Sequence, residues 1–323
     1  MYIGVDLGST NLKAALYDEK LTCIDQKSLP VAYIRQGEFI EFDGEKYFDD
    51  LVTILSQLTQ NRPGQVIQIA FTGQAESLLC LDKTGKAVHN AISWMDERSG
   101  EECALLEKQF TSSECHAKTG QQAVLPTWPA TKILWLRRNK PEIFENVATY
   151  MLLKDYIVYR LTNVLSADMS IATFSFYFDI YNKCYWQEML SAIGITEKQL
   201  PPLVEPCSVI GNLTEEIAAA TGMTTKTLVN TGTLDHFAGM IGTGNTTPGG
   251  MTLSTGTTMV LATITDGTPH PDTDLALHYG FLPDTYVALP VMESGGVCLD
   301  WFRRTCLNNM DYDTLNKELL AAP

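Results

Sequence analysis

Two aspartates at the ends of predicted strands have the clearest chemical potential in the chain. Asp6 closes a hydrophobic strand and precedes the turn Gly8-Ser9-Thr10, whose main-chain N–H groups and hydroxyls suit a phosphate. Asp235 lies where a short strand gives way to a helix. Transfer of a phosphoryl group to a hydroxyl needs a base near that hydroxyl and a cation bridging the phosphates, and the two carboxylates could supply both.

The phosphate-type turn occurs twice. Residues 5–18 align without a gap on residues 253–266, so that Gly8 falls on Gly256. Each copy predicts a strand, a tight turn and a second strand, and two copies at opposite ends of the chain predict two related domains that face each other across a cleft. The second copy has Ser254 in place of the aspartate, so only the first copy can help to hold a divalent cation.

Structural interpretations of these residues remain open. Asp6 could start its turn by capping its own backbone, and Asp235 fits the N-cap of a helix. Lys13, on the strand after the first turn, could reach a phosphate or be an ordinary exposed strand lysine. For Asp6, the duplication of the turn favours the functional interpretation.

A second group of polar residues suits a polyol. Gln74 and Glu76 leave a buried strand at a glycine turn, and the segment that follows crowds together Trp94, Asp96 and Arg98. An aromatic ring packs on the carbon–hydrogen faces of a sugar, while acids and amides pair with its hydroxyls. The local pattern is equally compatible with a surface ion pair between Asp96 and Arg98 beside a core tryptophan.

The surrounding pattern predicts a mixed sheet flanked by helices. The order is β-β-β-α-β, followed by a hairpin and a mainly helical region, with a small-residue helix from Asp235 to Ile241 near the end. Strands are predicted at residues 2–5, 12–17, 23–34, 66–71 and 228–230, and the hairpin at residues 78–81 and 87–90. Helices are predicted at residues 47–58, 99–110, 131–138, 154–161 and 186–193.

Composition predicts a soluble chain with two cores. Its 323 residues are 45% hydrophobic and 19% charged, and residues 242–250 are the best linker candidate because glycine, threonine and proline dominate them. We therefore expect a first domain at residues 1–243 and a shorter second domain at residues 244–323. The net charge of -15 argues against non-specific attraction to nucleic acid or to an anionic membrane. Without a predicted targeting or membrane-spanning segment, a cytoplasmic protein is expected.

The eight cysteines are predicted to be reduced core residues, with a structural disulfide as the less favoured alternative. No pair has Cys-x-x-Cys spacing, and the five histidines form no His-Glu-x-x-His cluster. A dedicated transition-metal site is therefore not expected.

Taken in order, these motifs resemble the FGGY carbohydrate kinases, and within that family the likeness is greatest to the xylulokinases. The resemblance implies an α/β, ribonuclease-H-like (actin-type ATPase) mixed-sheet domain plus the start of a second, related domain, with ATP and Mg²⁺ between two lobes. The motifs are residues 3–10, Thr72-Gly73-Gln74, Trp94-x-Asp96-x-Arg98, Thr119-Gly120, Pro126 with residues 131–136, Lys154-Asp155-Tyr156, residues 166–170, Gly232-x-x-Asp235, residues 253–257 and residues 298–301.

The resemblance also implies roles for individual residues. Asp235 would be the general base and would share the metal site with Asp6. The phosphate loops would comprise Gly8, Ser9, Thr10, Asn11 and Lys13 in the first lobe and Gly256, Thr257 and Thr258 in the second. The sugar would be bound by Gln74, Ala75, Glu76, Trp94, Asp96, Arg98 and His236.

Departures from the family pattern concern the acceptor. Xylulokinases typically have Gln-Met-His where this chain has Gln74-Ala75-Glu76, and asparagine in place of His236. Glycerol kinases have Gln-Arg-Glu, so Glu76 matches them while Ala75 removes the arginine. The acceptor is left open between another ketose, an aldonate and a polyol.

The expected activity is ATP-dependent phosphorylation of a small sugar or polyol, and a homodimer is an open expectation. Family members continue beyond the length of this chain into a glycine-rich adenine-binding segment, so poor ATP binding is expected here. The alternative is a catalytically incomplete sugar-binding or regulatory module. An ATPase acting on protein partners shares the phosphate turns, but residues 94–98 and 168–170 favour the sugar kinases.

Overall fold

The computed structural model describes residues 1–255, 259–265, 275–292 and 294–322. The predictions made for Gly256, Thr257, Thr258 and Asp266 lie outside the described residues. The phosphate contacts expected of the second turn therefore stay predictions.

The N-terminal part is built on a six-stranded mixed sheet of order β14-β15-β6-β1-β2-β3. β1 pairs antiparallel with β2 and parallel with β6, and β6 pairs parallel with β15. The strands are β1 (Tyr2–Leu7), β2 (Asn11–Tyr17), β3 (Cys23–Pro30), β6 (Gln68–Gly73), β14 (Val209–Asn212) and β15 (Leu228–Asn230). The predicted mixed sheet is confirmed. The strand expected at residues 23–34 ends earlier, at Pro30.

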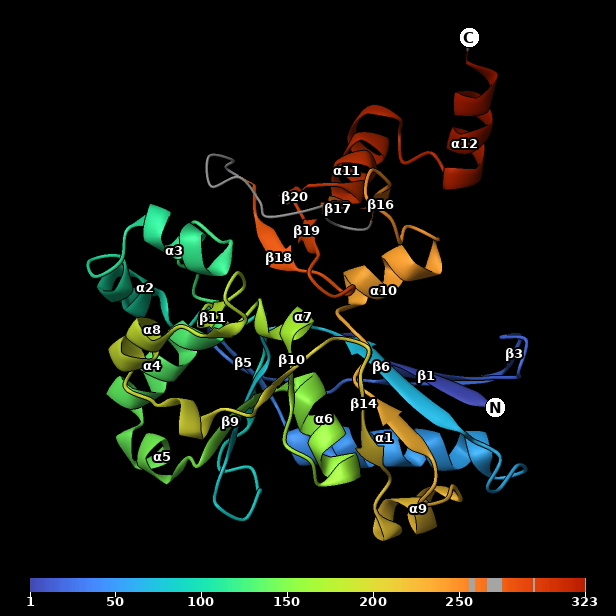
Figure 1. The fold of residues 1–323 in the computed structure, drawn as a ribbon. Coiled ribbons are helices and arrows are strands. Elements are labelled where there is room, and N and C mark those ends of the chain that lie inside the picture. The colour runs from blue at the N-terminus through green and yellow to red at the C-terminus, as the bar shows by residue number, and fades with distance from the viewer. Residues whose placement is uncertain (256–258, 266–274, 293, 323) are drawn as a thin grey trace.

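Three helices cover one face of this sheet: α1 (Gly44–Thr59), α6 (Leu153–Thr162) and α9 (Glu215–Thr221) (Figure 1). α1 starts because the Asp43 carboxylate accepts hydrogen bonds from two main-chain N–H groups of its first turn. Its apolar stripe, which includes the fully buried Leu51, Ile54 and Leu55, packs against the sheet. The helix predicted at residues 47–58 is confirmed and is one turn longer at its start.

A second sheet of order β4-β5-β8-β7-β9 and a group of helices form the left part of the molecule in Figure 1. The strands are β4 (Ile34–Gln36), β5 (Phe39–Phe42), β7 (Leu78–Leu81), β8 (Ala91–Ile92) and β9 (Thr149–Leu152). The helices are α2 (Gly100–Leu106), α3 (Ser112–Thr119), α4 (Pro129–Asn139), α5 (Pro141–Asn146) and α8 (Gln187–Ile193). Sequence reasoning missed α3, α5 and α9, which are short and present few apolar residues at helical spacing. It also extended the first helix of this group beyond Leu106, where α2 ends.

Short elements connect the two sheets. They are β10 (Ala167–Asp168), α7 (Met169–Ala172), β11 (Phe178–Asp179), β12 (Cys184–Tyr185), a 3₁₀ helix (Glu197–Gln199) and β13 (Leu203–Val204). α10 (Asp235–Gly242) then leads from β15 to the C-terminal part.

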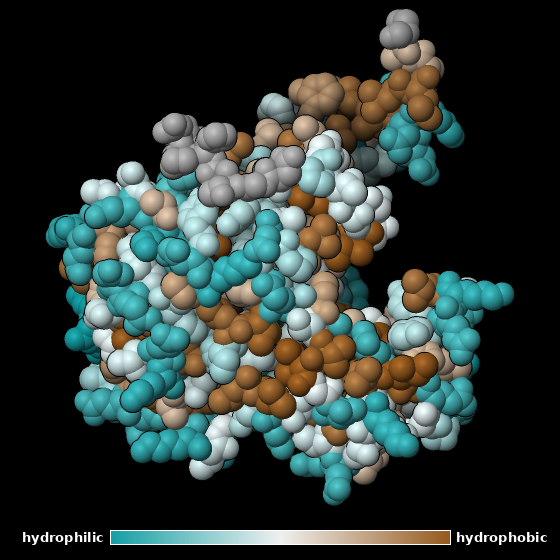
Figure 2. All heavy atoms as spheres, in the orientation of Figure 1, coloured by the Kyte–Doolittle hydropathy of each residue, from teal (hydrophilic) through white to brown (hydrophobic). Residues whose placement is uncertain are grey.

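The C-terminal part contains a five-stranded sheet and two helices. Its elements are β16 (Met251–Thr255), β17 (Met259–Thr265), β18 (Leu277–Tyr279), β19 (Tyr286–Ala288), β20 (Val291–Met292), α11 (Gly296–Cys306) and α12 (Tyr312–Ala321). Apolar side chains of α11, including Trp301 and Phe302, are exposed, and brown atoms mark this region at the top of Figure 2.

The two repeated hairpins differ in register by one residue. Asp6 pairs with Lys13 in the first, whereas Ser254 pairs with Val260 in the second. The gap-free alignment of the two copies predicts Leu261 opposite Ser254. Three residues instead of four therefore separate the paired ends in the second copy, so the sequence repeat is not an exact structural repeat.

The prediction for the cysteines is only partly correct. All eight are free, but only Cys80, Cys103 and Cys115 are buried. The other five are exposed, two of them on α11, because local apolar neighbours do not guarantee burial when the element itself lies at the surface. In the described part of the chain, no helix has both the length and the apolar character needed to cross a bilayer.

Burial beneath the sheet makes stability depend on the protonation of Asp155. This side chain is 2% exposed, and burial raises its pKa to about 7, with the Lys154 charge opposing the shift and Asp168 adding to it. The folded chain therefore binds a proton that the unfolded chain has already released between about pH 4 and pH 7. Stability contributed by this group is present at low pH and is lost as pH rises through about 7.

We expect Asp155→Asn to remove this pH dependence. The amide oxygen can still accept the hydrogen bond from the Asp168 N–H. In urea unfolding, the free energy of unfolding of the variant should increase relative to that of the wild type as pH rises from 4 to 7. Above pH 7 the variant should be more stable by about 1 to 3 kcal/mol. Asp49→Asn, on the exposed side of α1, is the control and should leave the dependence of the free energy of unfolding on pH unchanged. Parallel pH profiles for wild type and Asp155→Asn would contradict the assignment.

Candidate functional site

Three parallel strands bring the predicted site residues to one edge of the main sheet. β1, β6 and β15 lie side by side and run in the same direction, so their carboxyl ends meet. Asp6 lies near the end of β1, Gln74 follows β6, and Asp235 begins the helix after β15. Residues far apart in the sequence are thereby placed at a common edge.

Glycine makes the close approach of these strand ends possible. Gly232 has φ of 62°, and a Cβ there would lie 1.6 Å from the Phe71 carbonyl oxygen. At Gly73 a Cβ would lie 2.6 Å from the Cβ of Leu7. No other residue type fits either position without moving the backbone.

Hydrogen bonds fix the segment that precedes Asp235. Thr233 N–H donates to the Phe71 carbonyl at 3.1 Å, and Thr72 Oγ1 donates to the Thr233 carbonyl at 2.8 Å. The buried Lys154 ammonium, on α6, donates to the Thr231 carbonyl at 2.7 Å and to the Asp168 carboxylate at 2.6 Å. Asp235 is therefore presented by a rigidly supported loop.

Asp6 and Asp235 influence each other electrostatically. Partial burial raises the pKa of Asp6, Lys13 opposes the shift, and the charge of Asp235 raises the pKa further. Lys13 Nζ lies 3.7 Å from the Asp6 carboxylate across the β1–β2 pair. Desolvation by the surrounding protein also raises the pKa of Asp235, and the neighbouring His236 opposes this shift. The Asp235 side chain is nevertheless 46% exposed.

A cavity of about 950 Å³ opens along the sheet face next to these carboxylates. It is lined by residues of β1, β2, β3, β6 and α10, among them Asp6, Lys13, Thr72 and Ile241. Figure 2 shows the molecule notched on its right side, between α10 and the sheet. The cavity is large enough for a small ligand with several phosphates.

The first predicted phosphate turn lies at this edge. Gly8 has no room for a Cβ, which would lie 2.5 Å from the Asn11 carbonyl oxygen. The Gly8 carbonyl accepts a hydrogen bond from Tyr47 Oη at 3.1 Å, and Val31 N–H donates to the Thr10 carbonyl at 3.0 Å. These contacts anchor both sides of the turn, while Ser9 is half-buried and Thr10 is exposed.

The predicted acceptor residues do not line the 950 Å³ cavity, but contacts link several of them. Gln74 N–H donates to the Leu7 carbonyl at the end of β1. Ser77 Oγ donates to Gln74 Oε1 at 2.8 Å and accepts from the main-chain N–H of Trp94 at 3.0 Å. The Nε2 group of Gln74 is buried and has no hydrogen-bond partner among the described residues, so its two N–H donors remain for a ligand or water. Ala75 is 9% exposed, and Glu76 is half-buried with φ of 65°.

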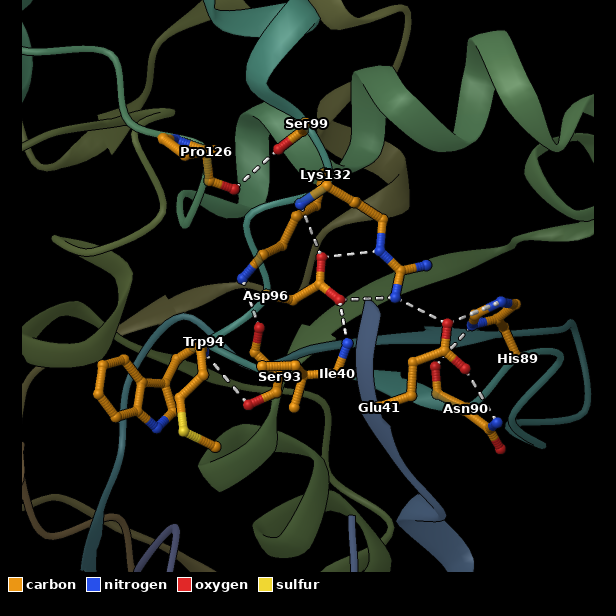
Figure 3. A network of polar contacts seen from close by, with 12 residues as sticks. Ile40, Glu41, His89, Asn90, Ser93, Trp94, Asp96, Ser99, Pro126 and Lys132 are labelled. Atoms are coloured by element: carbon orange, nitrogen blue, oxygen red, sulfur yellow. Dashed lines mark hydrogen bonds and ion pairs between the residues drawn. The ribbon is translucent and has the colours of Figure 1, made fainter. Parts of the chain in front are cut away.

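The alternative of a surface Asp96–Arg98 pair beside a core tryptophan is wrong in both parts. Asp96 and Arg98 are buried and paired at 2.7 Å, whereas Trp94 is 38% exposed. Arg98 also pairs with Glu41 at 2.8 Å, and Asp96 accepts from Ile40 N–H at 2.6 Å (Figure 3). The pair joins two distant chain segments, and its contact to sugar stays a prediction.

His236 follows Asp235 on α10. The main-chain N–H of His236 donates to the Asp235 carboxylate at 2.6 Å, and the imidazole Nε2 lies 4.0 Å from the same carboxylate. His278 is buried, stacks on Phe174 with ring centroids 4.3 Å apart, and has its pKa lowered by burial to about 3. His278 is therefore neutral, and His236 is the imidazole that can reach a ligand beside Asp235.

The donor set suits Mg²⁺. Asp6 and Asp235 offer hard carboxylate oxygens, and Mg²⁺ is commonly held by one or two carboxylates together with waters and substrate phosphates. Among the described residues, no group of three or more histidine, cysteine or acidic side chains could form an all-protein metal site. The arrangement thus fits a cation that binds together with a phosphate ligand.

Sequence reasoning missed two buried cations near the candidate site residues. Lys132 and Lys154 are both fully buried, on α4 and α6. Each stands among apolar residues at a core-facing helical position, a signal that a lysine there must have a polar partner. The pattern did not say which carbonyl groups those partners would be.

Comparisons with known proteins agree with this geometry. The profile of the N-terminal domain of the FGGY family of carbohydrate kinases matches residues 1–242. The xylulose kinase of Escherichia coli (strain K12) is 30% identical over 314 residues, which cover 96% of this chain and 64% of that protein. The chain spans about 65% of the length of the curated relatives it matches first.

Solved structures are similar as well. A xylulose kinase from Rhodospirillum rubrum has a TM-score of 0.90 at 27% identity, with 99% of this chain and 66% of that chain covered. A gluconate kinase from Lactobacillus acidophilus has a TM-score of 0.87 at 26% identity, with 94% and 62% covered. The predicted fold class, an α/β mixed-sheet fold of the actin type, is confirmed.

Proposed function

The chain belongs to the FGGY family of carbohydrate kinases, and we propose that it phosphorylates a hydroxyl group of a small carbohydrate with ATP as the donor. The observation that carries this proposal is the placement of Asp6 and Asp235 at one strand edge, beside a cavity and next to the turns that hold Gln74 and Trp94. The proposed base, the proposed cation ligands and the proposed sugar-binding groups would thereby be adjacent.

In the proposed reaction the acceptor hydroxyl oxygen attacks the γ-phosphorus of ATP. The bond from that phosphorus to the ADP oxygen breaks, and the hydroxyl proton passes to the Asp235 carboxylate. The raised pKa of Asp235 makes it a better proton acceptor than an ordinary aspartate. The segment before it is fixed by main-chain hydrogen bonds, so the base is positioned before substrate binds.

The remaining residues act on phosphate and cation. Mg²⁺, when bound by Asp6 and Asp235, would neutralise charge on the phosphate oxygens. We propose that Gly8, Ser9, Thr10, Asn11 and Lys13 contact the phosphates from the N-terminal domain, residues 1–243, and that Gly256, Thr257 and Thr258 do so from residues 244–323. The Lys13 side chain is 57% exposed at the cavity and can leave Asp6 for a phosphate.

The charges around the acceptor favour a neutral ketose or polyol over an aldonate. Arg98, which could otherwise bind a carboxylate, is already paired with Asp96 and Glu41. Lys132 donates to two main-chain carbonyls, and Glu76 adds a negative charge of its own. An anionic acceptor would therefore meet acidic groups, while the buried cations Arg98 and Lys132 are already engaged by other partners. We propose that Gln74, Ala75, Glu76, Trp94 and His236 contact the sugar directly, with Asp96 and Arg98 supporting them.

A second candidate function is sugar binding without catalysis. It would need only the predicted acceptor residues, which do not line the 950 Å³ cavity. Titration calorimetry with ATP and magnesium separates the two candidates. Tight nucleotide binding would argue for the kinase, and sugar binding without nucleotide binding would argue for a sugar-binding module.

A substrate panel tests the proposed function. Ketoses, polyols and aldonates are offered with ATP and magnesium, ADP release is followed by a coupled assay, and binding is followed by calorimetry. We expect ADP release with at least one neutral acceptor, and at least about tenfold weaker use of aldonates, a difference of about 1.4 kcal/mol. A preference for aldonates would overturn the acceptor assignment. If no member of the panel binds or raises ADP release, both candidates fail.

A further inference from the structure

Lys132 is a buried lysine that takes no part in the proposed phosphoryl transfer. It lies on α4 with its side chain fully buried, and its ammonium donates to the Ser93 carbonyl at 2.8 Å and to the Glu76 carbonyl at 3.3 Å. Burying an ammonium group costs several kcal/mol, and an apolar residue of similar size could fill such a site. Its presence calls for a task that methionine or leucine could not perform.

The two carbonyl groups belong to the two turns that carry the expected acceptor residues. One turn contains Gln74 and Glu76. The other contains Ser93 and Trp94, and Figure 3 shows its contact with Lys132. Glu76 has φ of 65°, a left-handed backbone that costs about 1 kcal/mol or more for a residue with a Cβ. The bond from Lys132 to its carbonyl helps to offset this cost. Ser77 provides a second link, from Trp94 to Gln74.

The charge of Lys132 also acts on Glu76. Within the described part of the chain, Lys132 Nζ has no carboxylate partner at ion-pair distance, so the Glu76 carboxylate is not consumed by a salt bridge. Burial raises the pKa of Glu76 to about 7, while Lys132 and a hydrogen bond from Thr127 oppose the shift. Burial lowers the pKa of Lys132 to about 8, with Glu76 and Asp96 opposing and Arg98 adding to it.

We propose that Lys132 is a positioning residue of the acceptor site, whose ammonium group ties the Glu76 turn to the Trp94 turn and favours the ionised form of the Glu76 carboxylate. Sugar hydroxyls donate to a carboxylate more strongly than to a carboxylic acid, so the ionised form is the binding form. The role toward sugar rests on the proposed function. The link between the two turns does not.

Hydrogen exchange measured by mass spectrometry tests the link without any ligand. In Lys132→Met, peptides covering residues 72–79 and 91–98 should exchange about tenfold faster, while peptides from α1 and the main sheet keep their wild-type rates. Lys132→Arg should restore most of the protection. Lys140→Met, an exposed lysine that follows the same helix, is the control and should change neither peptide. Unchanged exchange in both turns, or equal acceleration throughout the chain, would overturn the proposal.

Sugar affinity as a function of pH tests the effect on Glu76. The best acceptor from the panel is titrated by calorimetry between pH 6 and pH 9. Wild-type affinity should rise as pH increases through about 7, and in Lys132→Met this rise should move up by about 1 to 3 pH units, with affinity near pH 7.5 falling about tenfold. In Glu76→Gln the rise should be absent, and adding Lys132→Met should shift nothing further.

The exchange experiment tests the link between the two turns, and the pH titration tests the effect of Lys132 on Glu76. An unshifted pH profile in Lys132→Met would overturn the electrostatic part of the proposal. If the wild type binds no sugar, the proposed function fails on the acceptor side, and the exchange experiment still decides whether Lys132 joins the two turns.

Discussion

Asp235→Asn should lower turnover by about 10²- to 10⁴-fold while the dissociation constant for the sugar changes less than about threefold. The asparagine keeps the size of the side chain and its oxygen can still accept the His236 N–H, so the start of α10 is preserved. What is lost is the ability to take the proton from the acceptor hydroxyl. Coupled ADP release measures the turnover, and calorimetry measures the sugar affinity.

The matched control is Asp43→Asn. Asp43 also stands at the start of a helix, where it caps α1, and asparagine is an equally good cap. We expect wild-type turnover and affinity for this variant. If Asp235→Asn turns over as fast as the wild type, Asp235 is not the base. A variant that also loses sugar affinity more than tenfold would point to a binding role instead.

Removal of Asp235 also has an electrostatic consequence for Asp6. The charge of Asp235 raises the pKa of Asp6, so the neutral amide should leave Asp6 more acidic. The two carboxylates thus repel each other in the absence of a cation. This mutual repulsion explains why a pair of acidic side chains at the strand edge is suited to a cation that arrives with a phosphate ligand.

The strand-end carboxylates could be predicted because the signal for them is local. An apolar run followed by glycine and hydroxyl residues indicates where a strand ends, and parallel strands end at the same edge of a sheet. The sequence alone therefore placed Asp6 and Asp235 at turn positions, and the family resemblance assigned their roles. Neither required knowledge of a contact between distant residues.

The buried polar contacts could not be predicted, because their partners are distant in the sequence. Asp96 and Arg98 carry the pattern of a surface ion pair, and only the approach of Glu41 and Ile40 from β5 places them in the interior. The same applies to Lys132, whose partners are main-chain carbonyls that no side-chain pattern encodes. The register of the second hairpin was missed because aligned residue types do not determine the length of the turn between paired ends.

Gly232→Ala should lower the free energy of unfolding by about 3 to 5 kcal/mol, near the upper end of what single substitutions do. A Cβ at this position would lie 1.6 Å from the Phe71 carbonyl oxygen, so the loop must move away from β6. The left-handed backbone at φ of 62° adds a further cost for alanine. Urea unfolding monitored by tryptophan fluorescence measures the loss.

The displacement should also impair the chemistry in the molecules that remain folded. Moving the loop away from Phe71 disrupts the hydrogen bonds of Thr233, which hold the segment that carries Asp235. Turnover per folded molecule should therefore fall by at least about 10²-fold, since a base displaced by about 1 Å loses its alignment with the acceptor hydroxyl. Gly239→Ala is the control, because no described atom outside its own helix backbone lies within 4 Å of the Cβ position, and at this exposed position of α10 alanine is favoured by about 0.5 to 1 kcal/mol. A Gly232→Ala protein as stable and as active as the wild type would show that the close contact between β6 and this loop is not needed to position Asp235.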